Sequence, residues 1–394
     1  MKYNIWNKWD PLKVCMLGNN YAPEFFNGCD PKASDPLKRI CEETLEDLQG
    51  YKEVLQDFGV EVIQPAMDPN ERFLDNPQRY PRGPLQPRDY QLVIGNTCFV
   101  NKGADHPAIA ERLDEYSKVT YNEKTNFTSV YPYIEDEEKY NIIKGADYPS
   151  WEDFLSNRTN KEYFPEHVWK EMMEEYATGA MPSCSSASCF MIGKKLFVGI
   201  PAPGDAAFTN MEQFYPPEDE FSKLHPELEN FKVIYSAMDG HSDGNFHPIK
   251  PGAILSLCDV QNYTETFPGW DVCYLPSQSW NKVAGFRDLK KENAGKWYLA
   301  GETDNNKFTH FVETWLQDWV GYVEETVFDV NVLMLDEHHC CVANPNNEQV
   351  NTFLKKHKVE PVYVPWRHRF FWDGGLHCIT LDLYREGTQK DYFI

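Results

Sequence analysis

Three short segments contain the residue types that an enzyme needs to react with a cationic substrate. Residues 374–378 read GGLHC, residues 240–245 read GHSDGN, and residues 87–89 read PRD. A cysteine thiolate is a strong nucleophile, and an imidazole can take up the thiol proton and pass it on later. Two carboxylates, Asp89 and Asp243, can hold a planar cation through paired hydrogen bonds. Together these residues predict a nucleophilic site for a planar cation such as guanidinium.

The residues around Cys378 also carry structural expectations. The paired glycines before it predict a tight turn that leaves room for a ligand at the sulfur. His377 precedes Cys378 on a predicted strand, where neighbouring side chains point to opposite faces, so we expect His377 to face away and to be structural. The same alternation argues against a metal site at residues 338–341 (HHCC), because four consecutive ligands cannot easily surround one ion.

Spacing alone leaves structural alternatives open, because turns are rich in Gly, Asp and His in any protein. Cys378 would then be a buried core thiol, and His241 would be a turn histidine bonded to the backbone. Asp89 and Asp243 would merely cap turns.

Alternating short strands and helices must position these segments. The pattern favours one domain over residues 1–394, built from repeated α/β modules, with an insertion around residues 276–323. A Gly-Lys turn predicts a hairpin at residues 190–199. Helices are predicted at residues 36–58 and 347–357. Further strands are predicted at residues 13–17, 59–63, 91–95, 252–257, 270–275, 331–335, 360–364 and 377–384.

Composition limits the class of partner. The chain of 394 residues is 41% hydrophobic and 14% aromatic, which is typical of a folded globular protein, and its formal net charge is −23. Such a charge repels nucleic acid and anionic membranes and favours cationic ligands, although solubility alone also accounts for it. The 11 cysteines and the absence of an apolar leader segment at the start predict reduced thiols and a cytoplasmic location.

The three segments, in this order, resemble those of the amidinotransferases, and specifically the arginine:glycine branch of the guanidino-group-modifying enzymes. The resemblance spans nearly the whole chain. Its blocks are Trp9–Leu12, Pro87–Asp89 with Val93–Asn96, Asn331–Glu337, and Gly374–Cys378 with Thr380, Asp382 and Arg385–Thr388. The fold that the resemblance implies is a five-bladed α/β propeller (the pentein fold), with pseudo-fivefold ββαβ repeats and the site on the central axis.

The resemblance also implies roles for individual residues. Cys378 matches the nucleophile, and His241 matches the general acid and base. Asp243 and Asp89 match carboxylates that bind the guanidinium group. No metal or organic cofactor is expected, because the guanidinium group carries its own electrophilic carbon.

Two positions depart from the family pattern. The acid that partners the histidine falls at Ser185, whose hydroxyl can bond an imidazole but cannot stabilise imidazolium by charge. Local realignment, or an acid such as Glu324 or Glu325, would restore that function. The arginine that binds the substrate carboxylate falls near Val260, so the carboxylate of arginine, or the glycine acceptor, is expected to be held differently. The large insertion before Asn331 is one source of a replacement group.

The predicted function is transfer of the amidino group from arginine, or a related guanidino donor, to an amine acceptor through amidino-Cys378. One alternative is a guanidino-group hydrolase that uses water as acceptor. Another, suggested by Ser185, is a catalytically impaired guanidino-binding protein. The predicted partners are small molecules, with no nucleic acid and no membrane. Dimers are common in the family, so a homodimer is one expectation.

Overall fold

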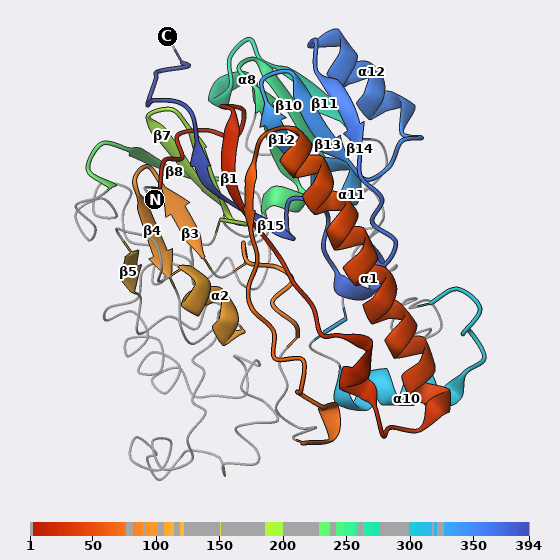
Figure 1. The fold of residues 1–394 in the computed structure, drawn as a ribbon. Coiled ribbons are helices and arrows are strands. Elements are labelled where there is room, and N and C mark those ends of the chain that lie inside the picture. Colours follow the sequence, from red (N-terminus) through yellow and green to blue (C-terminus); the bar gives the residue numbers. More distant parts are fainter. Residues whose placement is uncertain are drawn as a thin grey trace.

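A computed structural model shows how the chain is arranged (Figure 1). Its described part contains five three-stranded sheets, and helices connect strands in four of them, which confirms the predicted α/β class. The circular, five-bladed arrangement of these sheets stays a prediction. The structure describes residues 3–75, 82–89, 91–100, 106–113, 119–121, 150, 186–199, 228–236, 242–257, 263–275, 299–316, 319–320 and 327–393.

All five sheets are built in the same way. In each, the central strand pairs antiparallel with one neighbour and parallel with the other. The parallel strand lies later in the chain than the central strand, which leaves room for a helical connection between them. The strands are β15 (Thr380–Arg385), β1 (Leu12–Leu17) and β2 (Glu61–Ile63); β3 (Leu92–Ile94), β4 (Thr97–Val100) and β5 (Val119–Tyr121); β6 (Cys189–Ile192), β7 (Lys195–Gly199) and β8 (Lys232–Ser236); β9 (Phe246–Lys250), β10 (Ala253–Ser256) and β11 (Asp271–Tyr274); β12 (Leu333–Asp336), β13 (His339–Val342) and β14 (Glu360–Tyr363).

The first sheet joins the two ends of the described chain. β1 pairs antiparallel with β15, with Leu17 opposite Thr380. The pairing continues past the strands, because the Gly18 amide donates to the Ile379 carbonyl at 2.8 Å. The turn that carries Cys378 is therefore fixed against the N-terminal strand.

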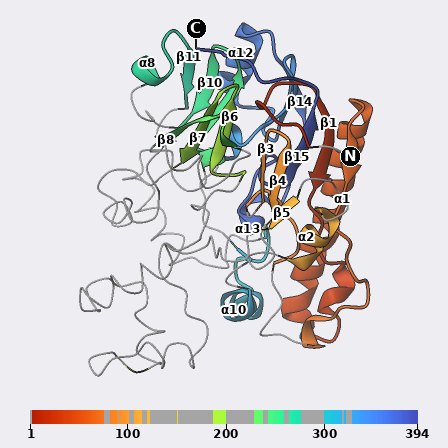
Figure 2. The ribbon, with the colours of Figure 1, turned by 90° about the vertical axis from the view of Figure 1, so that its left-hand side faces the viewer.

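The long helix α1 begins earlier than predicted. It spans Pro31–Asp57, whereas the sequence predicted a start at Pro36. Asp30 accepts a hydrogen bond from the Lys32 amide at 3.0 Å and caps the helix, and Pro31 occupies the first turn, where proline is tolerated. Figures 1 and 2 show α1 running along one side of the sheets toward α10. The other helices are α2 (Pro107–Leu113), α8 (Tyr263–Thr266), α10 (Asn306–Trp315), α11 (Val327–Val330), α12 (Glu348–Lys356) and α13 (Arg369–Trp372), with short 3-10 turns η1 (Pro23–Phe26), η2 (Phe73–Asp75) and η6 (Ser242–Gly244).

The predicted hairpin at residues 190–199 is confirmed as β6 and β7. Gly193, in the turn between them, has a φ of +63°, a conformation that glycine adopts without strain. A side chain there would also collide with the backbone, because a Cβ would lie 1.9 Å from the Lys390 carbonyl oxygen. The hairpin and the C-terminal segment are thus packed backbone to backbone.

The last strand begins later than predicted, and this changes the interpretation of His377. β15 starts at Thr380 rather than at residue 377, and residues 376–379 form a turn. Within it, the Ile379 amide donates to Gly375 at 3.2 Å and the Thr380 amide donates to His377 at 3.1 Å. Because His377 and Cys378 are not on a strand, their side chains are not forced to opposite faces.

The alternation argued for residues 338–341 is seen in the core. Cys340 packs in the apolar cluster of β10, β12 and α12, whereas Cys341 packs in the cluster of β1 and α1. The side chain of His339 contacts the carboxylate of Asp336, with Nδ1 2.9 Å from both oxygens. The described residues contain no cluster of potential ligands that could hold a metal ion.

The described part of the predicted insertion packs against α1. Phe308 and Val312 of α10 are fully buried in the same apolar cluster as Leu37 and Ile40 of α1. The division of the chain into domains stays a prediction. None of the helices in the described ranges is long and apolar enough to cross a membrane.

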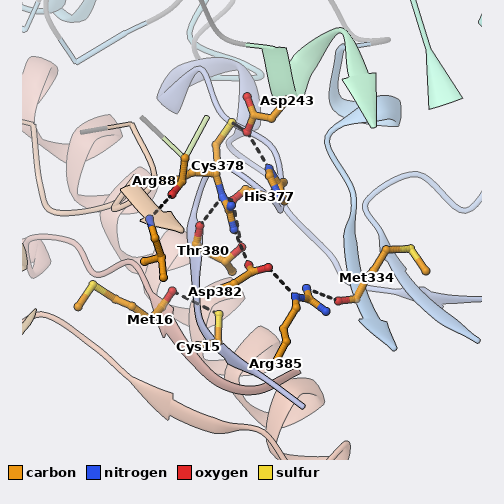
Figure 3. Close-up of polar contacts among 12 residues, drawn as sticks. Cys15, Met16, Arg88, Asp243, Met334, His377, Cys378, Thr380, Asp382 and Arg385 are labelled. Atoms are coloured by element: carbon orange, nitrogen blue, oxygen red, sulfur yellow. Dashed lines mark hydrogen bonds and ion pairs between the residues drawn. The ribbon is translucent and has the colours of Figure 1, made fainter. Parts of the chain in front are cut away.

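Buried ionic groups join β15 to the loop that contains Arg88. Asp382 lies between two arginines, with Arg88 Nη2 2.7 Å from one oxygen and Arg385 Nε 2.7 Å from the other (Figure 3). All three side chains are at most 2% exposed. Burial alone would raise the pKa of Asp382, but the charges of Arg385, Arg88 and Lys8 outweigh it and hold the pKa well below its usual value. The carboxylate is therefore ionised and fully paired.

Replacing Asp382 tests how far this network stabilises the fold. We expect Asp382→Asn to lower the free energy of unfolding by about 3–5 kcal/mol, because two buried arginines lose their counter-ion. The exposed pair of Asp271 and Lys356 offers a matched control, since Asp271→Asn should cost at most about 1 kcal/mol. Urea unfolding at pH 7 compares the two. Similar losses for both variants would contradict a structural role for the Asp382 network.

Candidate active site

The sulfur of Cys378 lies between a carboxylate and an amide. The thiol donates to Asp243 Oδ2 at 3.4 Å, and Asn331 Nδ2 donates to Sγ at 3.0 Å. The three residues come from the turn before β15, from η6, and from the segment between α11 and β12. Cys378 is buried at 9% exposure, so these groups make up much of the surroundings of the sulfur.

Asn331 fixes the turn as well as the sulfur. Its Oδ1 accepts hydrogen bonds from the amides of His377 at 2.9 Å and Cys378 at 3.0 Å. Its Nδ2 also donates to the Asp243 carbonyl at 3.3 Å. Because Oδ1 accepts two N–H groups, Nδ2 must be the atom that faces the sulfur, and the orientation of the amide is determined.

The two glycines before the turn are required by space. A Cβ on Gly374 would lie 2.2 Å from Nε2 of Gln86, and a Cβ on Gly375 would lie 2.6 Å from Oδ1 of Asn331. Neither glycine has a positive φ. The two glycines therefore leave space for the side chains of Gln86 and Asn331. They are not needed for an unusual backbone conformation.

His377 faces Asp243, contrary to the expectation that it faces away. Its Nδ1 lies 2.9 Å from Asp243 Oδ2, the same oxygen that the Cys378 thiol contacts (Figure 3). Burial, followed by the charges of Arg88 and Lys8, lowers the pKa of His377 well below its usual value. Burial thus favours the neutral imidazole, and because a carboxylate can only accept, Nδ1 is the nitrogen that carries the hydrogen in this contact. His377 holds one oxygen of Asp243 toward the sulfur.

Asp89 is the second carboxylate near the sulfur. It follows Arg88, which donates through Nε to the carbonyls of His377 and Thr380, both at 2.8 Å. Asp89 Oδ2 lies 3.4 Å from Arg82 Nη2, and its buried Oδ1 has no hydrogen-bond partner among the described residues. A buried carboxylate oxygen without a partner favours a bound hydrogen-bond donor.

The electrostatic surroundings keep the thiol protonated. Burial raises the pKa of Cys378 well above its usual value, and the charges of Asp243 and Asp89 raise it further. Hydrogen bonds from Gly375 and Asn331 lower it by less. A planar cation bound between the two carboxylates would cancel their charge and make the thiolate easier to form. The arrangement thus links ionisation of the nucleophile to the presence of a cation.

The site brings together three of the residues predicted from the sequence: Cys378, Asp243 and Asp89. His241 and Ser185 lie outside the described residues, as do Val260, Glu324 and Glu325, and their roles stay predictions. Sequence reasoning assigned no role to Asn331, although it opens one of the matching blocks. Arg88 was also given no role, although it lies beside Asp89.

Removing the charge of Asp89 should make Cys378 more reactive toward a neutral reagent. We expect Asp89→Asn to raise the rate of alkylation by iodoacetamide at pH 8 by up to about tenfold, because one unit of thiol pKa is a factor of ten in thiolate. With a cationic amidine reagent the same variant should react more slowly, because Asp89 no longer attracts it. Mass spectrometry of the Cys378 peptide over time measures both rates. The control Asp35→Asn, on an exposed position of α1, should change neither.

Removing the Asn331 amide should have the opposite effect on the thiol. We expect Asn331→Ala to slow alkylation by iodoacetamide, because the hydrogen bond that lowers the pKa of Cys378 is lost. The buried N–H of Cys378 also loses its acceptor, at about 1–3 kcal/mol, whereas the N–H of His377 keeps the Asn331 carbonyl at 3.4 Å. Asn305→Ala, which removes the N-cap of α10, is the matched control and should leave the alkylation rate unchanged. An unaltered rate in Asn331→Ala would show that this amide does not act on the sulfur.

No protein-family model matches the sequence. The chain is 23% identical over 421 aligned residues to the mitochondrial glycine amidinotransferase of Xenopus laevis, an alignment that covers 98% of this chain and 84% of the relative. Among solved structures it is similar to an amidinotransferase from the saxitoxin biosynthetic pathway of Microseira wollei, with a TM-score of 0.56 and 19% identity over 99% of both chains. The inosamine-phosphate amidinotransferase of Streptomyces griseus gives a TM-score of 0.57 and 15% identity, over 100% of this chain and 99% of that one. The resemblance to the amidinotransferases that the sequence predicted is therefore confirmed, by a relative that aligns over nearly the whole chain and by solved amidinotransferases that share its fold.

Proposed function

We propose that the protein is an amidinotransferase that carries the amidino group of arginine, or a related guanidino donor, on Cys378 and passes it to an amine. The observation that carries this proposal is the position of the Cys378 sulfur. It lies 3.4 Å from the Asp243 carboxylate and 3.0 Å from the Asn331 amide, in the field of Asp89. Such surroundings suit a reaction in which a cation and a thiolate meet.

The donor binds through its guanidinium group, which pairs with Asp89 and Asp243. Carboxylates bind guanidinium through short, charge-assisted hydrogen bonds, and Asp89 has an oxygen without a described partner. The bound cation offsets the charges that raise the pKa of Cys378, so the thiolate forms beside the carbon that it attacks. Without a bound cation, burial and the two carboxylates favour the protonated thiol.

The cycle has two halves. The Cys378 thiolate attacks the central guanidino carbon, and His241 protonates the departing amine, which gives ornithine from arginine and an amidino-cysteine. The acceptor amine, deprotonated by His241, then attacks the same carbon and releases the thiolate. Ser185 occupies the position where the family has an acid. In this proposal its hydroxyl forms a hydrogen bond with His241 but supplies no negative charge to stabilise the imidazolium.

The proposal extends to the arrangement of the chain. The same strand order in all five described sheets supports a single five-bladed propeller domain over residues 1–394, with an insertion around residues 276–323. Free thiols at every described cysteine support a reducing compartment such as the cytoplasm. The proposed partners are a small-molecule donor and a small-molecule acceptor, and the proposed reaction uses no cofactor.

Replacing the nucleophile tests the proposal directly. The protein is incubated with arginine and a panel of primary amines, while ornithine, the new guanidino compound and the mass of the Cys378 peptide are followed by mass spectrometry. We expect ornithine and a trapped amidino-Cys378, and we expect Cys378→Ala to lose both. Cys29→Ala, which removes a partly buried thiol between η1 and α1, should retain them.

The same assay separates transfer from hydrolysis. A transferase accumulates the adduct without an amine and forms product only when an amine is added. Citrulline or urea released without any added amine would instead show that water is the acceptor. Turnover that persists in Cys378→Ala would rule out the covalent mechanism.

A further inference from the structure

The guanidinium group of Arg82 lies on one of the proposed substrate-binding carboxylates. Arg82 Nη2 is 3.4 Å from Asp89 Oδ2, and Nη1 donates to the Trp372 carbonyl at 3.3 Å. Both contacts are long for charge-assisted hydrogen bonds, which are usually 2.7–2.9 Å. Arg82 thus holds Asp89 loosely, with the same chemical group that the donor would present.

Only one oxygen of Asp89 is involved in this contact. Oδ1 is buried and has no hydrogen-bond partner among the described residues. A guanidinium group that entered between Asp89 and Asp243 could engage Oδ1 and compete with Arg82 for Oδ2. Paired, shorter bonds to two carboxylates are stronger than the single long contact of Arg82, so the donor would displace Arg82 from Asp89.

A displaced Arg82 would need a new anionic partner. Its side chain is 19% exposed, so it lies at the edge of the site rather than in the core. Asp89, Asp243 and Arg82 together carry a net charge of −1. An α-amino acid with a guanidinium side chain carries +1, from two cationic groups and one carboxylate, so it balances these side chains. The carboxylate of the donor is the group that Arg82 can pair with.

We propose that Arg82 is the specificity-determining residue for the carboxylate of the donor: it pairs with Asp89 until the guanidinium group of the donor takes its place, and it then binds the donor carboxylate. This inference rests on the proposed function and deepens it, because it assigns a residue of this chain to the carboxylate of the donor. The neutral side chain of Val260 cannot form such an ion pair.

Binding without turnover tests this inference. The full-length Cys378→Ala protein is titrated by calorimetry with arginine and with agmatine, which has the same guanidinium group and chain but no carboxylate. We expect arginine to bind more tightly than agmatine. Arg82→Gln should weaken arginine binding roughly ten- to hundredfold, the range expected for one charge-assisted hydrogen-bonded pair. Agmatine binding should stay the same or become tighter, because Arg82 no longer competes for Asp89.

Two further variants show whether the effect belongs to Arg82. Arg82→Lys keeps the charge and should retain part of the preference for arginine. Arg72→Gln removes an arginine that bonds only to the carbonyls of Pro69 and Glu71 among the described residues, and it should change neither affinity. The midpoint of unfolding is measured for each variant and shows whether the substitution destabilises the whole protein.

The outcomes separate this inference from the proposed function. Equal weakening of arginine and agmatine in Arg82→Gln would show that Arg82 only positions Asp89, and it would overturn the inference alone. Arginine binding that is unaffected by Arg82→Gln would do the same. If neither compound binds and the wild-type Cys378 forms no adduct with arginine, the proposed function fails, and the inference fails with it.

Discussion

The Asp382 carboxylate, held between Arg88 and Arg385, is the interaction on which the geometry of the site depends. Arg88 also donates to the carbonyls of His377 and Thr380, so it joins the loop of Asp89 to the turn of Cys378. Arg385 reaches in the other direction, to the carbonyl of Met334 on β12 at 2.7 Å. Three segments far apart in the chain are therefore fixed to one buried ion, and two of them carry Asp89 and Cys378.

The charged groups around Asp382 and those around Cys378 have opposite roles. In the core, both oxygens of the Asp382 carboxylate are paired with arginines of the protein. Around Cys378 the charges of Asp243 and Asp89 favour the protonated thiol, and one oxygen of Asp89 lacks a described partner. Stability comes from the first arrangement, whereas the capacity to bind and activate a cation comes from the second.

The sequence predicted the parts of the site that depend on local residue types, and missed those that depend on distant contacts. Cys378, Asp243 and Asp89 were identified from short motifs. Arg88 was not, because its partner Asp382 is 294 residues away and no local pattern indicates the pair. The orientation of His377 was wrong because strand β15 begins three residues later than predicted, and a helix or strand boundary is the least certain feature of a sequence pattern. The fold class followed from alternating strands and helices, whose periodicity is local.

The pairing of β1 with β15 has a consequence for how the protein is made. β1 is synthesised long before its antiparallel partner β15, because most of the described chain lies between the two strands. The turn that holds Cys378 cannot be fixed until that partner arrives and Arg88 can reach Asp382. The nucleophile is therefore placed beside the loop of Asp89 in the same step that completes the first sheet.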